Sequence, residues 1–417
     1  MEYFMTFDTA RFDMVIVGAG LVGATLALAL GRQGHAVALL DGGDIVPCWQ
    51  AENIDARVSA ITPASQQLFT TLGVWPGIVR RRISPYGHMA VWDGEGTGQI
   101  AFSAAEVGSD VLGHIIENGV IRDALLEALS ECASVTLLPH ARVTALSGAE
   151  HQGRTITLED GRTLAAELVI GADGARSQIR ALSGLGHREY ATGQRAVVAT
   201  VWHEHDHEAT ARQRFMGTGP LAFLPLSIDG QQKASSIVWS ADTALADDLM
   251  GMEDDAFMRA LESGFEHHLG RIERISKRYD FALVQRHARR YVDDSLALVG
   301  DAAHNIHPLA GQGVNLGLMD IAVLAEELER AKRRGAPVGD IRILSRYARR
   351  RRGDNTVMLM AMDAFRIGFG TSWPLVRVLR NQGLTTTGRW PWARRLLIQQ
   401  AMGQRSDLPR AMHVSAV

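Results

Sequence analysis

One glycine-rich turn restricts the fold of this chain more than any other feature of its sequence. Residues 13–18 read as a short buried strand, residues 21–33 have a helical pattern, and residues 36–40 form a second apolar strand that ends at Asp41. The turn between the first strand and the helix reads Gly18-Ala-Gly20-Leu-Val-Gly23. This order of elements around this spacing predicts a Rossmann-like βαβ unit that binds a dinucleotide.

Four residues of this unit are candidates for holding the dinucleotide. Gly18 permits the tight turn, Gly20 lets the backbone approach a pyrophosphate, and Gly23 lets the helix pack closely on the strand. The positive end of the helix then stabilises the phosphate charge. Asp41, 23 positions beyond Gly18, is placed to accept hydrogen bonds from a ribose diol. The turn by itself fits FAD and NAD equally well.

Two later segments favour FAD over NAD. Asp173 and Asp301 each follow a buried strand, where a carboxylate can hold a ribityl hydroxyl group. The segment Gly311-Gln-Gly313-Val-Asn315 then opens a long helix, whose N–H groups and positive end would stabilise the anion of a reduced flavin. Each aspartate alone could equally well cap its own turn. Their occurrence together, in this order, indicates a flavin site.

These motifs resemble those of class A FAD-dependent monooxygenases. Asp173-Gly174 is similar to the DG motif of that class, and Gly300-Asp301 is similar to its GD motif. The segments 304–317, 57–61 and 116–118 resemble the ubiquinone-biosynthesis hydroxylases. Within that family, the sequence looks most like the branch that hydroxylates C5 of the ubiquinone ring, the 2-polyprenylphenol 6-hydroxylases, because of the segments 91–93, 112–118 and 400–403.

The resemblance runs from about residue 13 to residue 403 and implies a p-hydroxybenzoate hydroxylase-like fold of the α/β class. In such a fold, a Rossmann-like FAD-binding domain is interleaved with a mixed β-sheet substrate domain, and helices follow. We expect the FAD-binding domain at 13–75, 110–185 and 290–335, the substrate domain at 76–109 and 186–289, and a C-terminal helical region at 336–403. The strand-like segments 196–202, 221–226 and 235–240 support a separate sheet.

The resemblance also implies roles around the cofactor. Arg57 and Arg122 would contact FAD near its phosphates or its ribityl chain. Asp173 and Asp301 would lie at the middle of FAD, and residues 311–315 at its isoalloxazine ring. The sequence departs from the family at Asp41, where Glu is usual, and at Asn305, where Thr is usual.

The reaction implied by the resemblance is the hydroxylation of a polyprenylated phenol with NAD(P)H and O₂, through a flavin C4a-hydroperoxide. The sequence has no second dinucleotide fingerprint, so NAD(P)H would bind only transiently. Two other functions stay open: hydroxylation of a small soluble aromatic compound, and a non-catalytic flavin-binding scaffold of a ubiquinone biosynthetic complex. Such a complex would supply protein partners.

Catalytic and substrate residues are less well marked than the cofactor residues. His304 and His307 are the nearest acid–base candidates, although they could equally be hydrogen-bonded loop histidines. Pro308 would shape the wall where oxygen reacts. The apolar segment Gly219–Pro225 is predicted to be a strand, and we expect one of its faces, with Leu221 and Phe223, to line the ring pocket. Ordinary sheet core is the alternative.

Composition limits the remaining classes of function. The chain has 417 residues, of which 46% are hydrophobic and 21% charged, as in ordinary folded proteins. Cys48 and Cys132 are too few for a disulfide framework or a zinc site and fit reduced cytosolic thiols. We expect no metal site, because the His-rich tract 203–208 reads as the polar end of a strand. We also expect no nucleic-acid partner, because the arginines of 349–352 read as a solvated helix face.

Charge is distributed unevenly along the chain. Residues 331–417 carry 17 Lys and Arg against 4 Asp and Glu, whereas residues 1–330 carry 26 against 42. This asymmetry fits either an anionic partner or pairing between the two parts. We find no signal peptide and no spanning segment, and we therefore expect a cytoplasmic protein. Because a polyprenyl phenol resides in the bilayer, we also expect peripheral contact with the inner membrane. A homo-oligomer is a separate expectation.

Residues 388–402 could provide that membrane contact. Pro391 can start a short helix whose apolar side includes Met402, while Arg394 and Arg395 offer charge to anionic lipid. The other residues of this pattern are Trp390 and Trp392 at the helix entrance and Leu396 and Leu397 on the apolar side. A helix packed on its own core or on a partner subunit explains the pattern equally well.

Overall fold

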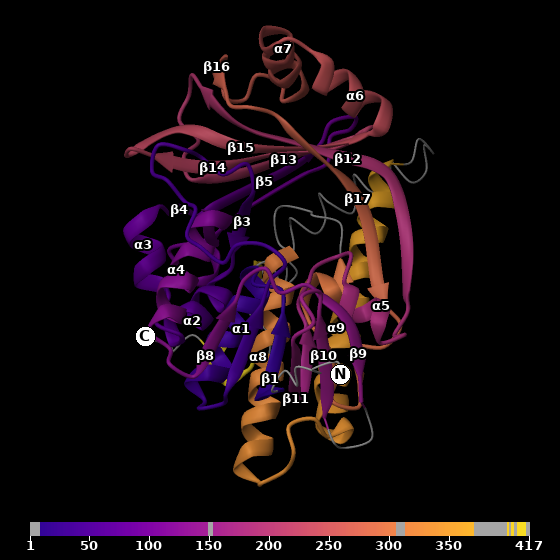
Figure 1. The fold of residues 1–417 in the computed structure, drawn as a ribbon. Coiled ribbons are helices and arrows are strands. Elements are labelled where there is room, and N and C mark those ends of the chain that lie inside the picture. The colour runs from indigo at the N-terminus through magenta and orange to yellow at the C-terminus, as the bar shows by residue number, and fades with distance from the viewer. Residues whose placement is uncertain are drawn as a thin grey trace.

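The computed structural model describes residues 9–148, 153–305, 313–370, 398–399, 402–403 and 407–413. Its framework consists of two large β-sheets and one small sheet, with helices packed around them (Figure 1). This is the mixed α/β architecture that the sequence predicts. The residue boundaries of the two expected domains stay a prediction.

The first sheet has eight strands and contains the glycine-rich turn. Its main path runs β18-β19-β11-β1-β2-β8, and β9 and β10 add to it through β11. The strands are β1 (Ala10–Val17), β2 (Val37–Leu40), β8 (Val135–Leu138), β9 (Val143–Ser147), β10 (Arg154–Leu158), β11 (Thr163–Gly171), β18 (Val292–Asp293) and β19 (Leu296–Leu298).

Parallel pairing in this sheet aligns four strand ends in one row. β1 pairs in parallel with β2 and β11, and β11 pairs in parallel with β19. Their registers place Val17 beside Leu40 and Gly171, and Gly171 beside Leu298. Because parallel strands present their carboxyl ends at one edge, the residues that follow these strands meet there.

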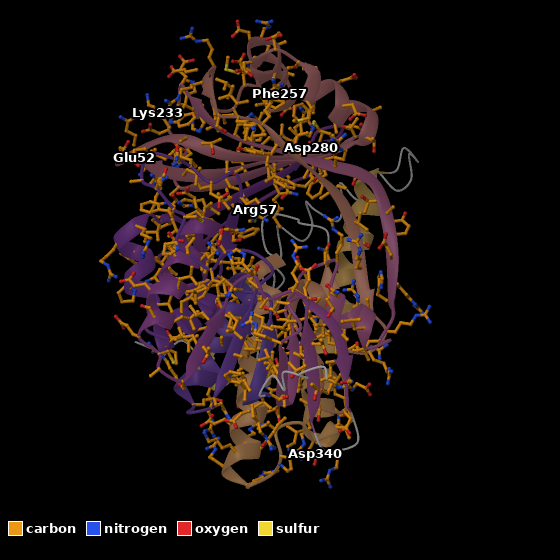
Figure 2. All side chains as sticks on the ribbon, viewed as in Figure 1. Glu52, Arg57, Lys233, Phe257, Asp280 and Asp340 are labelled. Carbon is orange, nitrogen blue, oxygen red and sulfur yellow. The ribbon has the colours of Figure 1, made fainter. Side chains whose placement is uncertain are left out.

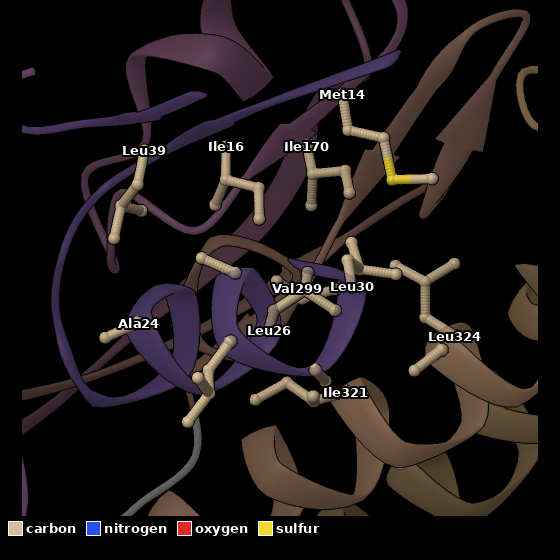
Figure 3. Packing of buried hydrophobic residues seen from close by; sticks show 14 of the residues in the cluster. Met14, Ile16, Ala24, Leu26, Leu30, Leu39, Ile170, Val299, Ile321 and Leu324 are labelled. Atoms are coloured by element: carbon tan, nitrogen blue, oxygen red, sulfur yellow. The ribbon is translucent and has the colours of Figure 1, made fainter. Parts of the chain in front are cut away.

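Helices cover this sheet and bury its apolar side chains. The helices of this part are α1 (Leu21–Arg32), α2 (Pro63–Thr71), α3 (Trp75–Arg81), α4 (Asn118–Ser130), α5 (Gln178–Leu182), α8 (Gly313–Arg333) and α9 (Ile341–Gly370), with the short η2 (Gly300–Ala302) and η3 (Arg410–Met412). Figure 3 shows Ile16 and Ile170 of the sheet facing Leu26 of α1, with Ile321 of α8 close by. All four side chains are fully buried.

The second sheet has nine strands in the order β20-β17-β12-β15-β14-β13-β5-β6, and β16 pairs with β12. All its pairings are antiparallel except β13 with β5. The strands are β5 (His88–Asp93), β6 (Gln99–Ser103), β12 (His187–His203), β13 (Thr210–Met216), β14 (Gly219–Ile228), β15 (Gln231–Asp242), β16 (Ile272–Ile275), β17 (Tyr279–Ala288) and β20 (His304–Asn305).

The two faces of the second sheet are covered differently. Helices α6 (Thr243–Gly251) and α7 (Asp254–Gly264) lie on one face, at the top of Figure 1. The other face looks toward the first sheet and packs on the small sheet. The small sheet contains β3 (Val58–Ile61), β7 (Gly113–Glu117) and β4 (Ser84–Tyr86), and η1 (Ala104–Val107) lies next to it in the chain.

The predicted βαβ start is confirmed by β1, α1 and β2, and the strand-like segments 196–202, 221–226 and 235–240 lie in β12, β14 and β15. Helix α7 ends at Gly264. Glu266 and His267 have φ angles of 56° and 55°, in the left-handed region that a right-handed helix cannot include. In the described part of the chain, no helix is both long enough and apolar enough to cross a membrane.

Candidate functional site

The glycine-rich turn is closed toward the protein and open on one side. Gly18 has a φ of +107°, and a Cβ atom there would lie 2.4 Å from the carbonyl oxygen of Ala172. A Cβ on Gly23 would lie 1.9 Å from the carbonyl oxygen of Gly18. At Gly20, by contrast, a Cβ would meet no atom within 4 Å. Gly20 is also the N-cap residue of α1, and no side chain there accepts a hydrogen bond from the first N–H groups of the helix. Open space at a helix N-terminus fits a pyrophosphate group.

Asp41 lies directly beside this turn, at the end of β2. One carboxylate oxygen accepts a hydrogen bond from the backbone N–H of Ala19 (2.8 Å), and the other accepts one from Gly43 (2.9 Å). The side chain is half-buried, and each oxygen has capacity for a further hydrogen bond. Asp41 therefore shapes the turn and lies where a ribose hydroxyl could reach it.

The loop after Asp41 is held by residues of α4. Arg122 donates to the carbonyl oxygens of Asp44 (2.9 Å) and Val46 (2.8 Å). The carboxylate of Asp123, a residue that the sequence did not single out, accepts from the backbone N–H groups of Cys48 (3.0 Å) and Trp49 (2.8 Å). Arg122 thus fixes the loop. Its direct contact with FAD stays a prediction.

The end of the same loop is fixed by a second carboxylate. Glu117 is buried, and accepts from the backbone N–H of Asp55 (2.7 Å) and from Arg82 (2.8 Å). Burial raises the pKa of Glu117, although Arg82 and the hydrogen bond from Asp55 act in the opposite direction. Arg57 follows this anchor and is exposed, and Figure 2 shows it between the first and second sheets. The segment 116–118 that carries the resemblance includes Glu117, but the sequence does not show this anchoring role.

The aspartates of the DG and GD motifs differ in their surroundings. Asp173 helps to cap α5, whose N-cap residue is Ser177. One oxygen of Asp173 accepts from the hydroxyl of Ser177 (2.5 Å), and the other accepts from the N–H groups of Gln178 (2.7 Å) and Ile179 (3.0 Å). Capping is therefore its visible role. Asp301 is exposed and accepts only a long hydrogen bond of 3.4 Å from Asn305 among its described contacts. Desolvation by the surrounding protein atoms raises the pKa of its carboxyl, although His304 and the hydrogen bond from Asn305 act in the opposite direction.

His304 has a different position from the one expected of a catalytic group. It is 3% exposed, and its Nε2 lies 2.5 Å from Asp320 of α8. This pairing fixes the turn that contains Asp301 and leaves the ring engaged inside the protein. The sequence did not identify Asp320. His307, Pro308 and Gly311 lie outside the described residues.

The start of α8 completes this edge of the site. Gly313 is the first residue of the helix and is exposed. The side-chain oxygen of Asn315 accepts from the backbone N–H of Thr62 (3.2 Å), and its amide nitrogen donates to the carbonyl oxygen of Ala60 (2.7 Å). Asn315 therefore ties α8 to β3 and to the start of α2. Its place beside the isoalloxazine ring stays a prediction.

The predicted substrate residues Leu221 and Phe223 lie on the wrong face of β14. Both are buried in the cluster under α6 and α7, where Phe223 stacks on Phe265 with 3.9 Å between ring centroids. Their neighbours Ala222 and Leu224 point to the opposite face, which looks toward the first sheet. The alternation of the strand predicts two apolar faces, but it does not show which of them the helices cover.

The C-terminal region is only partly described. Ile398 and Met402 are buried in one cluster with Tyr86 and Leu112. Met402 is 1% exposed, so for this residue the structure supports the alternative that it packs on the core of the protein. The other predicted interfacial residues, Trp390, Trp392, Arg394, Arg395, Leu396 and Leu397, lie outside the described residues.

The geometry as a whole fits FAD. Gly20, Asp41 and Asp301 lie at the common edge formed by the ends of β1, β2 and β19. At that edge, Gly20 leaves the N-terminus of α1 open, and Asp41 offers a carboxylate to a ribose. Asp301 adds a second carboxylate after β19. This is the placement that ligands prefer in parallel α/β sheets.

Similarity to known proteins also supports an FAD-binding protein. Residues 11–359 match a family model described as an FAD binding domain. The chain is 40% identical to the ubiquinone hydroxylase UbiL of Rhodospirillum rubrum, over 94% of this chain and 89% of that protein. It is 37% identical to the 3-demethoxyubiquinol 3-hydroxylase of Escherichia coli, over 94% and 98% of the two chains.

Solved structures agree on the fold. The p-nitrophenol 4-monooxygenase PnpA of Pseudomonas putida superposes with a TM-score of 0.76 at 20% identity, covering 95% of this chain and all of that chain. The fold, the open glycine turn and the close sequence relatives agree, and the chain belongs to the class A FAD-dependent monooxygenases, in the family that includes the ubiquinone-biosynthesis hydroxylases.

Proposed function

We propose that this enzyme hydroxylates a polyprenylated phenol of ubiquinone biosynthesis, using NAD(P)H as a transient electron donor and O₂. The observation that carries the proposal is the apolar face that the second sheet turns toward the first. Ala196, Val198 and Leu283 are buried there against Ala56. Phe281 pairs with Ala196 across the strands and extends this face, yet it is 41% exposed.

An exposed aromatic edge that continues a buried apolar face suits a long apolar chain. Tyr279 pairs with Val198 in the same way as Phe281 pairs with Ala196, and it is 40% exposed. A phenol ring placed near the flavin would leave its polyprenyl tail to cover these side chains. A small soluble aromatic compound would leave them in water, which makes it the less favoured substrate.

Bound FAD would supply the oxygen-activating chemistry, and the chain would supply position and a dry surrounding. Gly20 and the start of α1 would receive the pyrophosphate, Asp41 a ribose hydroxyl and Asp301 a ribityl hydroxyl. The apolar face around Val198 and Leu283 would exclude water from the ring being oxidised. On the basis of the sequence alone, we also propose that Pro308 shapes the part of the site where oxygen reacts.

Kinetics with and without a tail test the substrate class. The variant Phe281→Ser/Tyr279→Ser should lower kcat/KM about tenfold for a long-tailed phenol, and less than twofold for the same phenol without its tail. Tyr190→Ser is the matched control, because Tyr190 is also an exposed aromatic residue, on β12 opposite Gln285. Equal losses for both substrates would contradict the tail assignment. If no phenol stimulates NAD(P)H oxidation, a flavin-binding scaffold becomes the better proposal.

For the ring position, we propose C5 of a 2-polyprenylphenol. The named relatives include a 3-demethoxyubiquinol 3-hydroxylase, so that ring position is the alternative. Mass spectrometry of cells that lack this protein separates the two. Accumulation of a polyprenylphenol without the C5 oxygen supports the proposal, and accumulation of demethoxyubiquinone would replace it with the alternative.

A further inference from the structure

A circle of polar residues lies behind the turn that contains Asp301. Side-chain hydrogen bonds link its members, and the pairing of two strands closes it. It begins at Asp320 of α8 and passes through Arg351 and Asn355 of α9. It then continues through Tyr291 and His287 to His304, next to the turn. All of these side chains except His287, which is half-buried, are at most 3% exposed. None of the class motifs explains why so many polar groups are buried here.

Asp320 is the centre of this circle and is fully buried. Its Oδ2 accepts from the backbone N–H of Gly300 (2.9 Å) and lies 2.5 Å from Nε2 of His304, while its Oδ1 accepts from Nε of Arg351 (2.7 Å). Burial alone would raise the pKa of Asp320, but His304 and Arg351 outweigh it and lower the pKa. An ionised Asp320 can only accept, so Nε2 of His304 carries the proton.

Arg351 carries the circle into α9. Its two terminal nitrogens donate to Asp354 (2.9 Å) and to the side-chain oxygen of Asn355 (2.8 Å). The amide nitrogen of Asn355 donates to the hydroxyl oxygen of Tyr291 (3.3 Å). The three nitrogens of the planar guanidinium group therefore donate to three different residues, Asp320, Asp354 and Asn355. The single ammonium nitrogen of a lysine cannot reproduce this geometry.

The remaining contacts lead back to the turn. The hydroxyl of Tyr291 lies 2.7 Å from Nε2 of His287. Burial, together with the nearby charges of His304, Arg352 and Arg188, lowers the pKa of His287 to about 4, so its neutral ring accepts from Tyr291 at neutral pH. The backbones of His287 and His304 are paired across β17 and β20, and this strand pairing closes the circle.

A buried ion pair is weak evidence for stability, because desolvation offsets most of its attraction. Apolar contacts between α8 and α9 could hold the helices together without it. What the circle adds is a fixed connection from α9 to Gly300 and His304, on either side of Asp301. We propose that Asp320 and Arg351 are positioning residues that hold the 300–305 turn in the shape that binds FAD. This inference rests on the proposed contact between Asp301 and FAD.

The test uses the full chain and measures FAD affinity separately from folding. The double variant Asp320→Asn/Arg351→Met removes both charges and leaves neither stranded. We expect its dissociation constant for FAD to rise at least tenfold and the visible spectrum of its bound flavin to change. Arg351→Lys keeps the charge but loses the fork, and should give an intermediate rise. If the double variant does not fold, the FAD affinity of Arg351→Lys tests the proposal in its place.

Arg350→Met is the matched control. Arg350 also ties α9 to α8, through Glu326 and Glu327 at 3.0 Å each, but it does not touch the 300–305 turn. Its FAD dissociation constant should change less than twofold, while urea unfolding of the FAD-free protein reports any loss of stability in every variant. Equal weakening of FAD binding by Arg350→Met would overturn the proposal, as would unchanged FAD affinity in a folded Arg351 variant.

Asp301→Ala separates this proposal from the site on which it rests. We expect it to weaken FAD binding about tenfold with little change in the stability of the FAD-free protein. If Asp301→Ala leaves FAD binding unchanged while the Arg351 variants weaken it, the Asp301 contact is wrong and the circle positions another part of the turn. If only Asp301→Ala weakens binding, the positioning proposal is wrong.

Discussion

Residues of one motif can have different physical roles, and the glycine-rich turn shows this clearly. Gly23 is required by the fold itself, because any side chain there would collide with the carbonyl oxygen of Gly18. Gly20 has open space around it and an ordinary φ of −73°. The fold does not need glycine at that position, and its smallness serves the expected pyrophosphate.

This difference predicts opposite outcomes for two conservative substitutions. Gly23→Ala should destabilise the FAD-free protein by on the order of 3 kcal/mol, because the new methyl group must displace the backbone. Gly20→Ala should change that stability by less than about 1 kcal/mol but weaken FAD binding. Urea unfolding of the FAD-free protein and FAD titration measure the two effects. A Gly20→Ala protein with normal FAD affinity would remove Gly20 from the proposed site.

Buried histidines also make the stability depend on pH. His203 is fully buried between the carbonyl oxygen of His205 (2.7 Å) and the hydroxyl of Ser235 (2.9 Å). Burial lowers the pKa of His203 to about 4, from its ordinary value of 6.5. The unfolded chain therefore takes up this proton first as the pH falls. The stabilising contribution of a neutral, buried His203 is therefore full above pH 6.5 and is lost as the pH falls from 6.5 to about 4.

We expect the His203→Gln variant to lose less stability on acidification than the unmodified protein. The linkage relation gives a difference of about 2 kcal/mol at pH 5 for one such histidine. Urea unfolding at pH 7 and pH 5 measures it, and His88→Gln, at an exposed histidine, is the control. A parallel loss of stability in both variants would show that other groups cause the acid sensitivity.

At the scale of elements, β14 shows how one strand serves two environments. Its odd-numbered residues Leu221 and Phe223 belong to the core under α6 and α7, and Leu224 belongs to the cluster with the small sheet. Alternation along the strand predicts two apolar faces. Which face meets the helices depends on where α6 and α7 (residues 243–264) pack, and the alternation along β14 does not show this.

Phe223→Ala therefore tests a core role. Truncating this side chain, which stacks on Phe265, should destabilise the protein by about 3–5 kcal/mol. FAD content and the coupling of NAD(P)H oxidation to hydroxylation should then fall together, because the whole sheet loosens. Flavin absorbance and hydrogen peroxide release measure the two. Peroxide release that increases while FAD content and stability stay normal would restore Phe223 to the substrate wall.

At the scale of the whole molecule, the basic C-terminal part is in part neutralised by the acidic body. Arg350 and Arg351 of α9 pair with Glu326, Glu327 and Asp320 of α8. The expectation that residues 349–352 form a solvated face is therefore wrong for Arg351. The charge asymmetry of the sequence serves internal packing as well as any external partner.

The proposed peripheral membrane contact can be tested on residues 388–402 by their charge. The variant Arg394→Glu/Arg395→Glu should reduce co-sedimentation with anionic liposomes at low salt, because each basic residue near such a surface contributes about 1 kcal/mol. Physiological salt should weaken the binding of the unmodified protein as well. Binding that ignores both changes would refute the electrostatic part. No binding at all would favour contact with a partner protein.

The sequence by itself determined the βαβ start, the edge where Gly18, Asp41 and Asp301 meet, and the family. These features depend on local spacing and on periodicity, which a single chain displays directly. The sequence left open whether Asp173 caps its own turn, and the structure shows it accepting hydrogen bonds from Ser177, Gln178 and Ile179. Only the tertiary structure decided that His304 pairs with Asp320 and that Phe223 faces α6 and α7. These two outcomes depend on which other element covers the side chain. Burial and pairing between elements leave no periodic trace in the sequence, because they arise only when the sheets and helices pack.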